Sequence, residues 1–227
     1  MLKIASWNIG EDELYKDNKL TKESYKYIKT MIIENNIDII CFQENIISNE
    51  YIKNNTLLKY KVDMFLSTSK DGFSTGISIY SKYPISLIKK VMFNNPNFKY
   101  KDKISYDRGF VFVQVVNTPL VICSGHALPF HVFNESPSDF KYIFDEMETE
   151  MINIFNDTFI LTCDLNYENI EELFPKISKI SNILKLENTY KNKQVDHILV
   201  SKNIQVLNSK VIKTRFDHNI CICDLEI

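Results

Sequence analysis

One short segment, Phe159–Asn166, constrains the chain most. Its first five residues are apolar or β-branched, and a run of this length bounded by polar residues predicts a buried β-strand. The strand runs directly into Asp164 and Asn166, which are two residues apart and therefore project on the same side of an extended chain. A simple turn would explain this pattern, but a carboxylate and an amide at the end of a buried strand could also position water against a phosphate.

The same arrangement recurs elsewhere in the chain. The strand predicted over residues 2–8 ends in Asn8, and the strand predicted over 37–43 runs into Glu44. Polar residues that end or adjoin predicted strands are Asn8, Glu44, His126, Asp164, Asn166, Asp196, Asp217 and His218. We therefore expect these side chains to share one site.

Hydrophobic periodicity predicts many strands and few helices. Strands are predicted over residues 2–8, 37–43, 60–66, 76–81, 85–93, 109–116, 120–124, 159–163, 194–201, 204–213 and 220–227. Helices are predicted over 19–36, 136–154 and 168–180, the second starting at Ser136-Pro137-Ser138-Asp139 and the last interrupted at Pro175, whereas 11–18 and 94–107 are predicted loops. Because the helices are too few for a doubly wound parallel sheet, we predict a layered α/β sandwich.

Composition restricts the possible classes of protein. The 227 residues contain no repeat or linker-like stretch, so we predict a single domain over 1–227. The net charge of −2 provides no global basic field for nucleic acid, although a local patch could serve. There is no signal-peptide pattern and no apolar run of membrane-spanning length, so we expect no membrane partner. The five cysteines lack zinc-site spacing, and we expect buried free thiols in a monomeric cytoplasmic protein.

The polar residues favour a hard divalent cation. Mg²⁺ binds oxygen ligands, keeps several waters and takes one or two carboxylates. Glu44 and Asn8, with Asp217 beside them, suit that role, and Mn²⁺ could replace Mg²⁺ there. Phosphodiester cleavage also needs an oriented water and charge relief for the leaving oxygen, which Asp and His residues paired by hydrogen bonds can supply.

Several short motifs together resemble those of the endonuclease/exonuclease/phosphatase superfamily, and they occur in the same order. They are Ser6-Trp7-Asn8, Gln43-Glu44, Gly125-His126, Asp164-Leu165-Asn166, Val195-Asp196-His197-Ile198-Leu199 and Asp217-His218. The resemblance implies the DNase I-like fold, a four-layered α/β sandwich in which two mostly antiparallel β-sheets pack together between flanking helices. It also implies a metal-dependent phosphoric ester hydrolase.

The resemblance implies a role for each matching residue. Glu44 would be the principal metal ligand, with Asn8 nearby and Asp217 beside them. Asp164 would orient or deprotonate the attacking water, and Asn166 would hydrogen-bond the phosphate or the leaving oxygen.

Three further residues would contact the phosphate or support a residue that does. His218 would contact the scissile phosphate while Asp196 holds its ring, and His126 would be the second phosphate-facing histidine. Arg108 resembles a phosphate-contacting arginine of the DNase branch.

The chain also departs from the superfamily pattern. Cys163 stands where glycine usually precedes the aspartate, and Phe216 stands where serine is usual. The DNase branch has a glutamate before Gly76, and no carboxylate stands there in this chain. His197 must face away from its neighbour Asp196 on a strand, so we expect it in the core or behind the site, and His131 is expected in a loop.

Substrate class stays open at this point. The motifs that mark abasic-site endonucleases and inositol phosphatases are missing around Asn8 and Asp196. A nuclease or DNA-end phosphodiesterase is the leading hypothesis, with nucleic acid as partner. A phosphatase or phosphodiesterase acting on a small molecule or lipid headgroup is the alternative, and an inactive binding module is the third. A basic stretch interleaved with aromatic residues could bind a strand or be an ordinary solvated surface: Lys82, Lys89, Lys90, Lys99, Lys101, Lys103 and Arg108.

Overall fold

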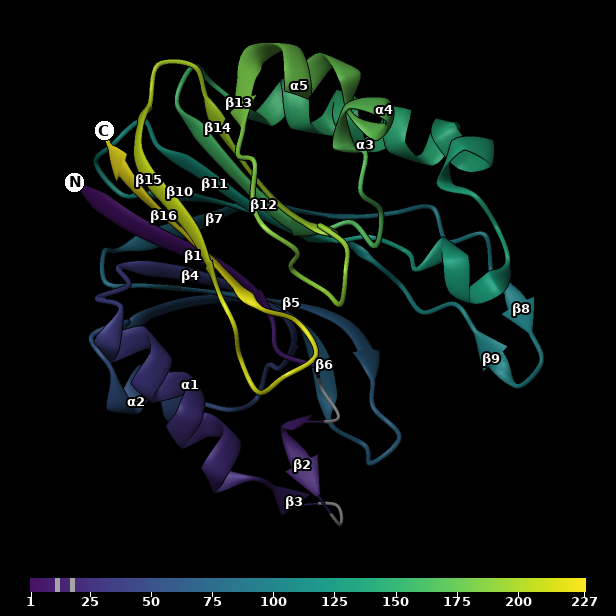
Figure 1. Ribbon diagram of the computed structural model, residues 1–227, viewed down its shortest axis with the longest axis horizontal. Coiled ribbons are helices and arrows are strands. Elements are labelled where there is room, and N and C mark those ends of the chain that lie inside the picture. Colours follow the sequence, from purple (N-terminus) through teal and green to yellow (C-terminus); the bar gives the residue numbers. More distant parts are fainter. Residues whose placement is uncertain (11–12, 17–18) are drawn as a thin grey trace.

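Two β-sheets packed face to face form the centre of the protein, and helices cover both outer faces (Figure 1). The computed structural model describes residues 1–10, 13–16 and 19–227. Each sheet has six strands, and most neighbouring strands in both sheets are antiparallel. The predicted four-layered, DNase I-like α/β sandwich is therefore confirmed.

The first sheet has the order β15-β16-β1-β4-β6-β5. Its one parallel pair joins β1 to β4, and all its other pairs are antiparallel. Helices α1 (Lys22–Glu34) and α2 (Tyr51–Asn55) belong to its outer layer. The strands are β1 (Leu2–Asn8), β4 (Ile39–Ile46), β5 (Tyr60–Thr68), β6 (Ser74–Ser81), β15 (Gln205–Ile212) and β16 (Ile220–Glu226).

The second sheet has the order β13-β14-β12-β11-β10-β7 and also contains one parallel pair, β11 with β12. Helices α3 (Lys141–Ile154), α4 (Ile170–Leu173) and α5 (Pro175–Ile180) cover its outer face. The strands are β7 (Ile85–Met92), β10 (Gly109–Val115), β11 (Val121–His126), β12 (Phe159–Asp164), β13 (Ser181–Ile183) and β14 (Asp196–Ser201).

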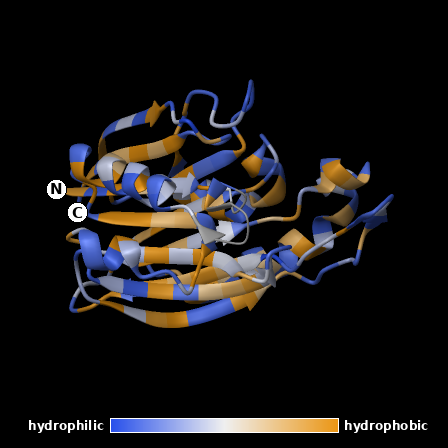
Figure 2. Cartoon of the chain, turned by 90° about the horizontal axis from the view of Figure 1, so that it is seen from below, coloured by the Kyte–Doolittle hydropathy of each residue, from blue (hydrophilic) through white to orange (hydrophobic). Residues whose placement is uncertain are grey.

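Three apolar clusters hold the layers together. One fills the space between the sheets and contains Ile4, Ile77 and Ile122. The other two lie beneath the helices, with Trp7 and Ile28 in the cluster under α1 and the aromatic-rich cluster under α3 to α5. Figure 2 shows the corresponding hydrophobic stretches along the strands and helices. Helix α3 contributes Ile143, Phe144, Met147 and Met151 to the aromatic-rich cluster.

Most predicted elements exist, with shifted ends. Helix α1 begins at Lys22 rather than residue 19, because the backbone of β3 (Lys19–Leu20) pairs with β2 (Tyr15–Lys16). The rest of the predicted 11–18 loop, residues 11–12 and 17–18, lies outside the described residues. The helix predicted to start at Ser136 begins as α3 only at Lys141, and residues Pro137–Phe140 before it form a separate 3₁₀ turn, η3.

Some short elements were not predicted. The 94–107 stretch is not wholly irregular, because β8 (Lys99–Tyr100) and β9 (Lys103–Ile104) form a small hairpin. Its turn uses Lys101 at a φ of 56°. A 3₁₀ turn, η2 (Phe130–Phe133), packs against β8. Neither α2 nor β13 was expected, since such short elements carry little periodicity.

The topology gathers the strand ends that carry polar residues. Because β1 is parallel to β4 and β11 is parallel to β12, the carboxyl ends of each pair lie at a common edge. The two edges meet across the sandwich, where Asn8 at the end of β1 hydrogen-bonds Asp164 at the end of β12. Among the described residues, no helix is long and apolar enough to span a membrane.

Candidate active site

A cleft of about 960 Å³ opens at this edge of the sandwich. Its lining includes eight of the nine predicted site residues: Asn8, Glu44, Arg108, His126, Asp164, Asn166, Asp217 and His218. The ninth, Asp196, is buried behind His218. The fold therefore brings the predicted residues together, and their roles in catalysis or metal binding stay predictions.

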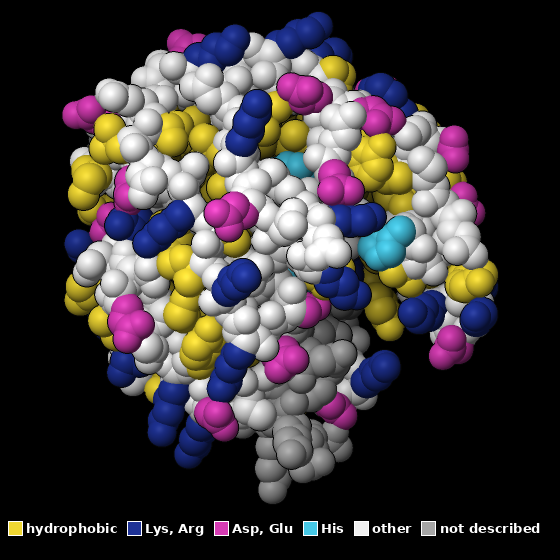
Figure 3. Space-filling model, in the orientation of Figure 1, with side chains coloured by type: hydrophobic (Ala, Val, Ile, Leu, Met, Phe, Trp, Pro, Cys, Tyr) yellow, Lys and Arg dark blue, Asp and Glu magenta, His cyan; other side chains and the backbone are white. Residues whose placement is uncertain are grey.

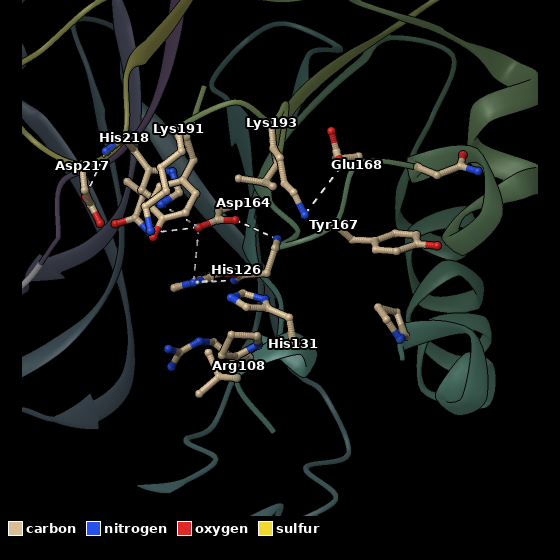
Figure 4. Close-up of a pocket in the computed structure, with 18 of the residues that line it drawn as sticks. Arg108, His126, His131, Asp164, Tyr167, Glu168, Lys191, Lys193, Asp217 and His218 are labelled. Carbon is tan, nitrogen blue, oxygen red and sulfur yellow. Dashed lines mark hydrogen bonds and ion pairs between the residues drawn. The ribbon is translucent and has the colours of Figure 1, made fainter. Parts of the chain in front are cut away.

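Asp164 lies at the centre of the cleft (Figure 4). It ends a fully buried strand and is only 1% exposed. Its Oδ2 accepts a hydrogen bond from Asn8 Nδ2 at 2.9 Å and lies 3.6 Å from His126 Nε2 and 3.8 Å from His218 Nε2. One carboxylate oxygen thus faces an amide and two imidazoles that come from three other segments of the chain.

The Asp-x-Asn segment is both a turn and part of the cleft. Asn166 adopts a φ of 53°, and its backbone N–H donates to Asp164 Oδ1 at 2.8 Å. Its side-chain Nδ2 donates to the Ala127 carbonyl at 3.2 Å and lies 3.4 Å from His126 Nε2. The turn therefore fixes the carboxylate and directs the amide toward the histidine.

A β-bulge presents Glu44 to the cleft. The register between β4 and β6 shifts between Phe42 and Asn45, and Glu44 has a φ of 54°. Bulges redirect side chains, and a positive φ in a residue other than glycine costs free energy, so both features are frequent at functional sites. Glu44 Oε1 lies 3.8 Å from His126 Nε2, on the side of the ring that also faces Asp164.

Asp196 and His218 form a buried pair. Asp196 Oδ2 lies 2.8 Å from His218 Nδ1, which leaves His218 Nε2 facing Asp164. The Asp196 backbone N–H donates to Thr189 Oγ1, and the ring of Tyr190 lies 4.6 Å from the His218 ring. Carboxylate and aromatic ring together fix the orientation of the imidazole.

The pair and its neighbours have shifted pKa values. Burial lowers the pKa of His218, but the carboxylates of Asp196, Asp164 and Asp217 outweigh it and raise that pKa to about 10. Burial and the nearby Asp196 raise the pKa of Asp164 to about 7. Burial, Arg108 and His218 hold the pKa of His126 well below its ordinary value. The two cleft histidines are thus driven in opposite directions, one toward the charged form and one toward the neutral form.

One compact group of described residues could hold an ion, and it differs from the predicted metal set. Asp164, Asp196 and His218 offer ligand atoms within 4.8 Å of one another. Asp196 and His218 of this group already hydrogen-bond each other. Glu44, Asn8 and Asp217 all line the same cleft with oxygen atoms, and as metal ligands they stay a prediction.

Arg108 precedes β10 and points into the cleft near His126 (Figure 4). Its Nη1 donates to the Asp107 carbonyl at 3.1 Å. Its buried Nε has no hydrogen-bond partner among the described residues. A guanidinium with free donors beside two site residues is well placed for an anion.

The departures from the superfamily pattern have structural explanations. Phe216 stacks on Trp7 with ring centroids 5.2 Å apart, so its side chain belongs to the core. Cys163 is fully buried, and the five cysteines are free and buried, as expected. His197 is buried, with its Nε2 2.8 Å from the Tyr167 carbonyl, and it does not line the cleft.

Sequence reasoning missed one wall of the cleft. Tyr190, Lys191 and Lys193 lie in a turn just before β14, and His131 lies on η2. His131 had been expected in a loop without a role. The signal for the turn was weak: a Lys-Asn-Lys run six to four residues before His197. For His131 the signal was its position soon after a strand that ends in His126.

The basic stretch over 82–108 does not form one surface. Lys82 pairs with Asp38 at the edge where β4 begins, opposite the cleft. Lys89 pairs with Glu150 on α3. Arg108 lines the cleft, and Tyr106 lies beside it in a smaller pocket shared with Glu44 and His126. The β8–β9 part packs against η2, which carries His131 of the cleft wall.

Comparisons with known proteins agree with this geometry. No curated protein sequence matches the chain. Its fold is similar to that of a mannosyl-6-phosphatase from Bacteroides thetaiotaomicron, with a TM-score of 0.69, 16% identity and 100% of both chains covered. It is also similar to the human Nocturnin catalytic domain, with a TM-score of 0.66, 14% identity and coverage of 99% of this chain and 93% of that one.

A humanized TDP2 from D. rerio aligns with a TM-score of 0.59 and 14% identity over 100% of this chain and 99% of that chain. Identities this low show the fold alone. The model of the Endonuclease/Exonuclease/phosphatase family, by contrast, matches residues 5–215. That match spans most of the chain, so the protein belongs to the endonuclease/exonuclease/phosphatase family, whose members hydrolyse phosphoric esters.

Proposed function

We propose that the protein is a Mg²⁺-dependent phosphoesterase that cleaves a phosphodiester bond in this cleft. The observation that carries the proposal is the environment of Asp164 Oδ2, which accepts from Asn8 at 2.9 Å and faces the imidazoles of His126 at 3.6 Å and His218 at 3.8 Å. A carboxylate so placed can bind a water molecule and direct it at a phosphorus atom between the histidines.

Asp164 acts on the attacking water. Its pKa of about 7 makes it a base matched to neutral pH, since a general base works best when its pKa is close to the operating pH. The Asn8 amide and the Asn166 backbone N–H hold its two oxygens, so the carboxylate keeps one orientation. The water proton passes to a carboxylate oxygen as the water oxygen bonds to phosphorus. The bond from phosphorus to the leaving oxygen then breaks, and the leaving oxygen takes up a proton from solvent.

His218 donates to the phosphate. The pKa of about 10 keeps its Nε2 protonated at neutral pH, and Asp196 holds the ring through Nδ1. A charged donor of fixed orientation stabilises the negative charge that develops on the phosphoryl oxygens. His126, Arg108 and the Asn166 amide contact the remaining oxygens or the leaving group.

The cleft also suits a divalent metal, on which members of the family generally depend. Glu44, Asn8 and Asp217 would hold it, because all three offer oxygen atoms to the cleft and a hard cation prefers such ligands. When bound, the metal supplies polarisation of a phosphoryl oxygen and charge relief in the transition state.

We favour a single strand or a free end of nucleic acid as the substrate. A cleft of about 960 Å³ is of the size that holds a small ligand or a few nucleotide units, not a duplex. The β8–β9 hairpin, which packs against η2 beside the cleft, exposes Lys99, Tyr100, Lys101 and Lys103. Basic and aromatic side chains interleaved in this way can follow a single strand.

A small phosphorylated molecule is the second candidate. The size of the cleft favours it equally, and one protein of similar fold is named a mannosyl-6-phosphatase. The net charge of −2 also suits a substrate that needs no extended basic surface.

An activity screen tests the proposal. The protein would be supplied with Mg²⁺ or Mn²⁺ and offered single-stranded DNA, nicked duplex, RNA, 5′-blocked DNA ends, a bis-phosphodiester and sugar phosphates. We expect turnover that EDTA abolishes and that Glu44→Gln removes without unfolding the protein. Glu34→Gln, which removes the same charge from the exposed end of α1, should leave turnover unchanged. Activity that survives EDTA would refute the metal-dependent mechanism.

A further inference from the structure

Residues 190–193 form one wall of the cleft, and the lysines of this wall have no role in the proposed chemistry. These residues form a tight turn, in which the Tyr190 N–H donates to the Lys193 carbonyl at 3.0 Å and the Lys193 N–H donates back to the Tyr190 carbonyl at 2.9 Å. Lys191 adopts a φ of 50° within the turn. The turn is also tied to the site, since Tyr190 forms a β-bridge with His218 and Thr189 Oγ1 accepts the Asp196 N–H. The backbone that carries the two lysines is therefore held in fixed relation to the Asp196–His218 pair.

Three lysines and a histidine converge here from three separate elements. Lys191 and Lys193 come from the turn, His131 comes from η2, and Lys103 comes from β9. Burial and then the positive charges of Lys193, Lys191 and Lys103 lower the pKa of His131, which shows that the three lysines act on one place. In Figure 3, dark blue Lys and Arg side chains lie next to a cyan His at a recess on this face.

Carboxylates do not fully compensate this charge. Glu168 lies 3.9 Å from Lys193, but the two side chains are 55% and 64% exposed, and such a pair contributes little free energy. Lys191 lies over the Tyr190 ring at 4.7 Å and forms no ion pair with a described carboxylate. Asp217, which also lines the cleft, attracts Lys191 as well. Like charges gathered with only weak, exposed counterions favour an anionic ligand.

Lys191, Lys193 and His131 line the same cleft as Asp164 and His218. We infer that they form a second anion subsite, which binds a further phosphate of a substrate whose scissile phosphate lies at Asp164. This inference rests on the proposed function, and it narrows the substrate class to molecules that carry a second anionic group. The second group could be the next phosphate of a nucleic-acid strand or the second phosphate of a small bisphosphate.

Equilibrium binding tests the subsite without turnover. The metal-free protein, kept in EDTA, would be titrated with adenosine 3′,5′-bisphosphate against adenosine 5′-monophosphate, and with fructose 1,6-bisphosphate against fructose 6-phosphate. We expect the bisphosphate of at least one pair to bind about tenfold more tightly than its monophosphate, the scale of one charge-assisted contact. Tighter binding of the bisphosphate in the nucleotide pair alone indicates that the substrate is a nucleotide. Tighter binding in the sugar pair alone indicates a small phosphorylated metabolite. Tighter binding in both pairs indicates that the subsite recognises the phosphate group alone.

Variants of the 190–193 turn test whether its lysines cause the tighter binding of the bisphosphate. Lys191→Gln/Lys193→Gln should abolish it, His131→Gln should reduce it, and Lys202→Gln, an exposed lysine on the β14–β15 turn, should preserve it. Equal binding of bisphosphate and monophosphate in both pairs, or an advantage that survives the double variant, would overturn the inference. Failure of the proposed function would look different, because the metal-dependent hydrolysis itself would be missing.

Discussion

The substitution Asp196→Asn should remove most of the increase in the pKa of His218. Asp196 Oδ2 lies 2.8 Å from His218 Nδ1, both residues are buried, and the Asp196 charge is the largest influence that raises the His218 pKa from 6.5 to about 10. Asparagine keeps the shape but loses the charge, while burial continues to lower the pKa. The gap between about 10 and 6.5 corresponds to roughly 5 kcal/mol, at 1.36 kcal/mol for each pH unit.

We therefore expect the His218 pKa to fall by about 2 units or more in the variant, since Asp164 and Asp217 still favour the protonated ring. The assay is an NMR titration of the imidazole resonances in the metal-free protein, with His218→Gln used to assign the signal. His131, an exposed histidine on η2, serves as an internal control whose titration should stay in place. A His218 pKa near 6.5 in the unsubstituted protein would refute the reasoning.

The same coupling makes stability depend on pH. A histidine whose pKa is raised by folding stabilises the folded state fully below its unfolded pKa of about 6.5, and this contribution is lost as the pH rises through the folded value of about 10. The difference in Tm between the protein and Asp196→Asn should therefore be largest near pH 6 and shrink steadily toward pH 10. A difference that grows with pH would contradict the assigned sign.

Other predictions concern the site and the scaffold. In a double-mutant cycle, Asp196→Asn and His218→Ala should each lower kcat about 10²-fold, and the double variant should lower it little further, because the effects of residues that act as a unit are not additive. If the two losses in kcat multiply, the residues act independently. Glu148, fully buried on α3, accepts the N–H groups of Lys176 and Ile177, so Glu148→Ala should lower the unfolding free energy by about 2–4 kcal/mol in urea titrations, whereas Glu148→Gln should retain most of it. If nucleic acid is the substrate, replacing Lys99, Lys101 and Lys103 of the β8–β9 hairpin by glutamine should raise KM more than it lowers kcat. The same change should make KM less dependent on salt concentration, whereas an unchanged KM would favour the small-molecule candidate.

The fold could be predicted because its long strands carry clear patterns. Buried strands such as β12 read as short apolar runs, and their polar ends marked where the site would lie. Pro175 separates α4 from α5 where a helix break was expected. What could not be predicted are elements of two to five residues, such as α2 and the β8–β9 hairpin, because they are too short for a periodic signal.

The sequence predicted which residues line the cleft better than it predicted how their side chains are oriented. The sequence places Glu44 after a strand, but the bulge and positive φ that aim its side chain depend on pairing with β6. The lysines of the 190–193 turn could not be told from ordinary surface lysines, since their significance arises only when His131 approaches from a segment about sixty residues away. Equally, the basic stretch over 82–108 looked continuous in sequence, while the fold sends Lys82 to the edge opposite the cleft.

The central claim is that Asp164 directs the attacking water, and the most direct test is the kcat of Asp164→Asn. Asparagine preserves the shape of the side chain and removes the base, so kcat on the best substrate of the screen should fall about 10³-fold or more, within the usual range for a general base. The unfolding midpoint should not decrease, because the substitution removes a buried charge close to Asp196. Asp157→Asn, an exposed substitution just before β12, is the matched control and should leave kcat unchanged. A kcat of Asp164→Asn within tenfold of the unsubstituted protein would contradict the account.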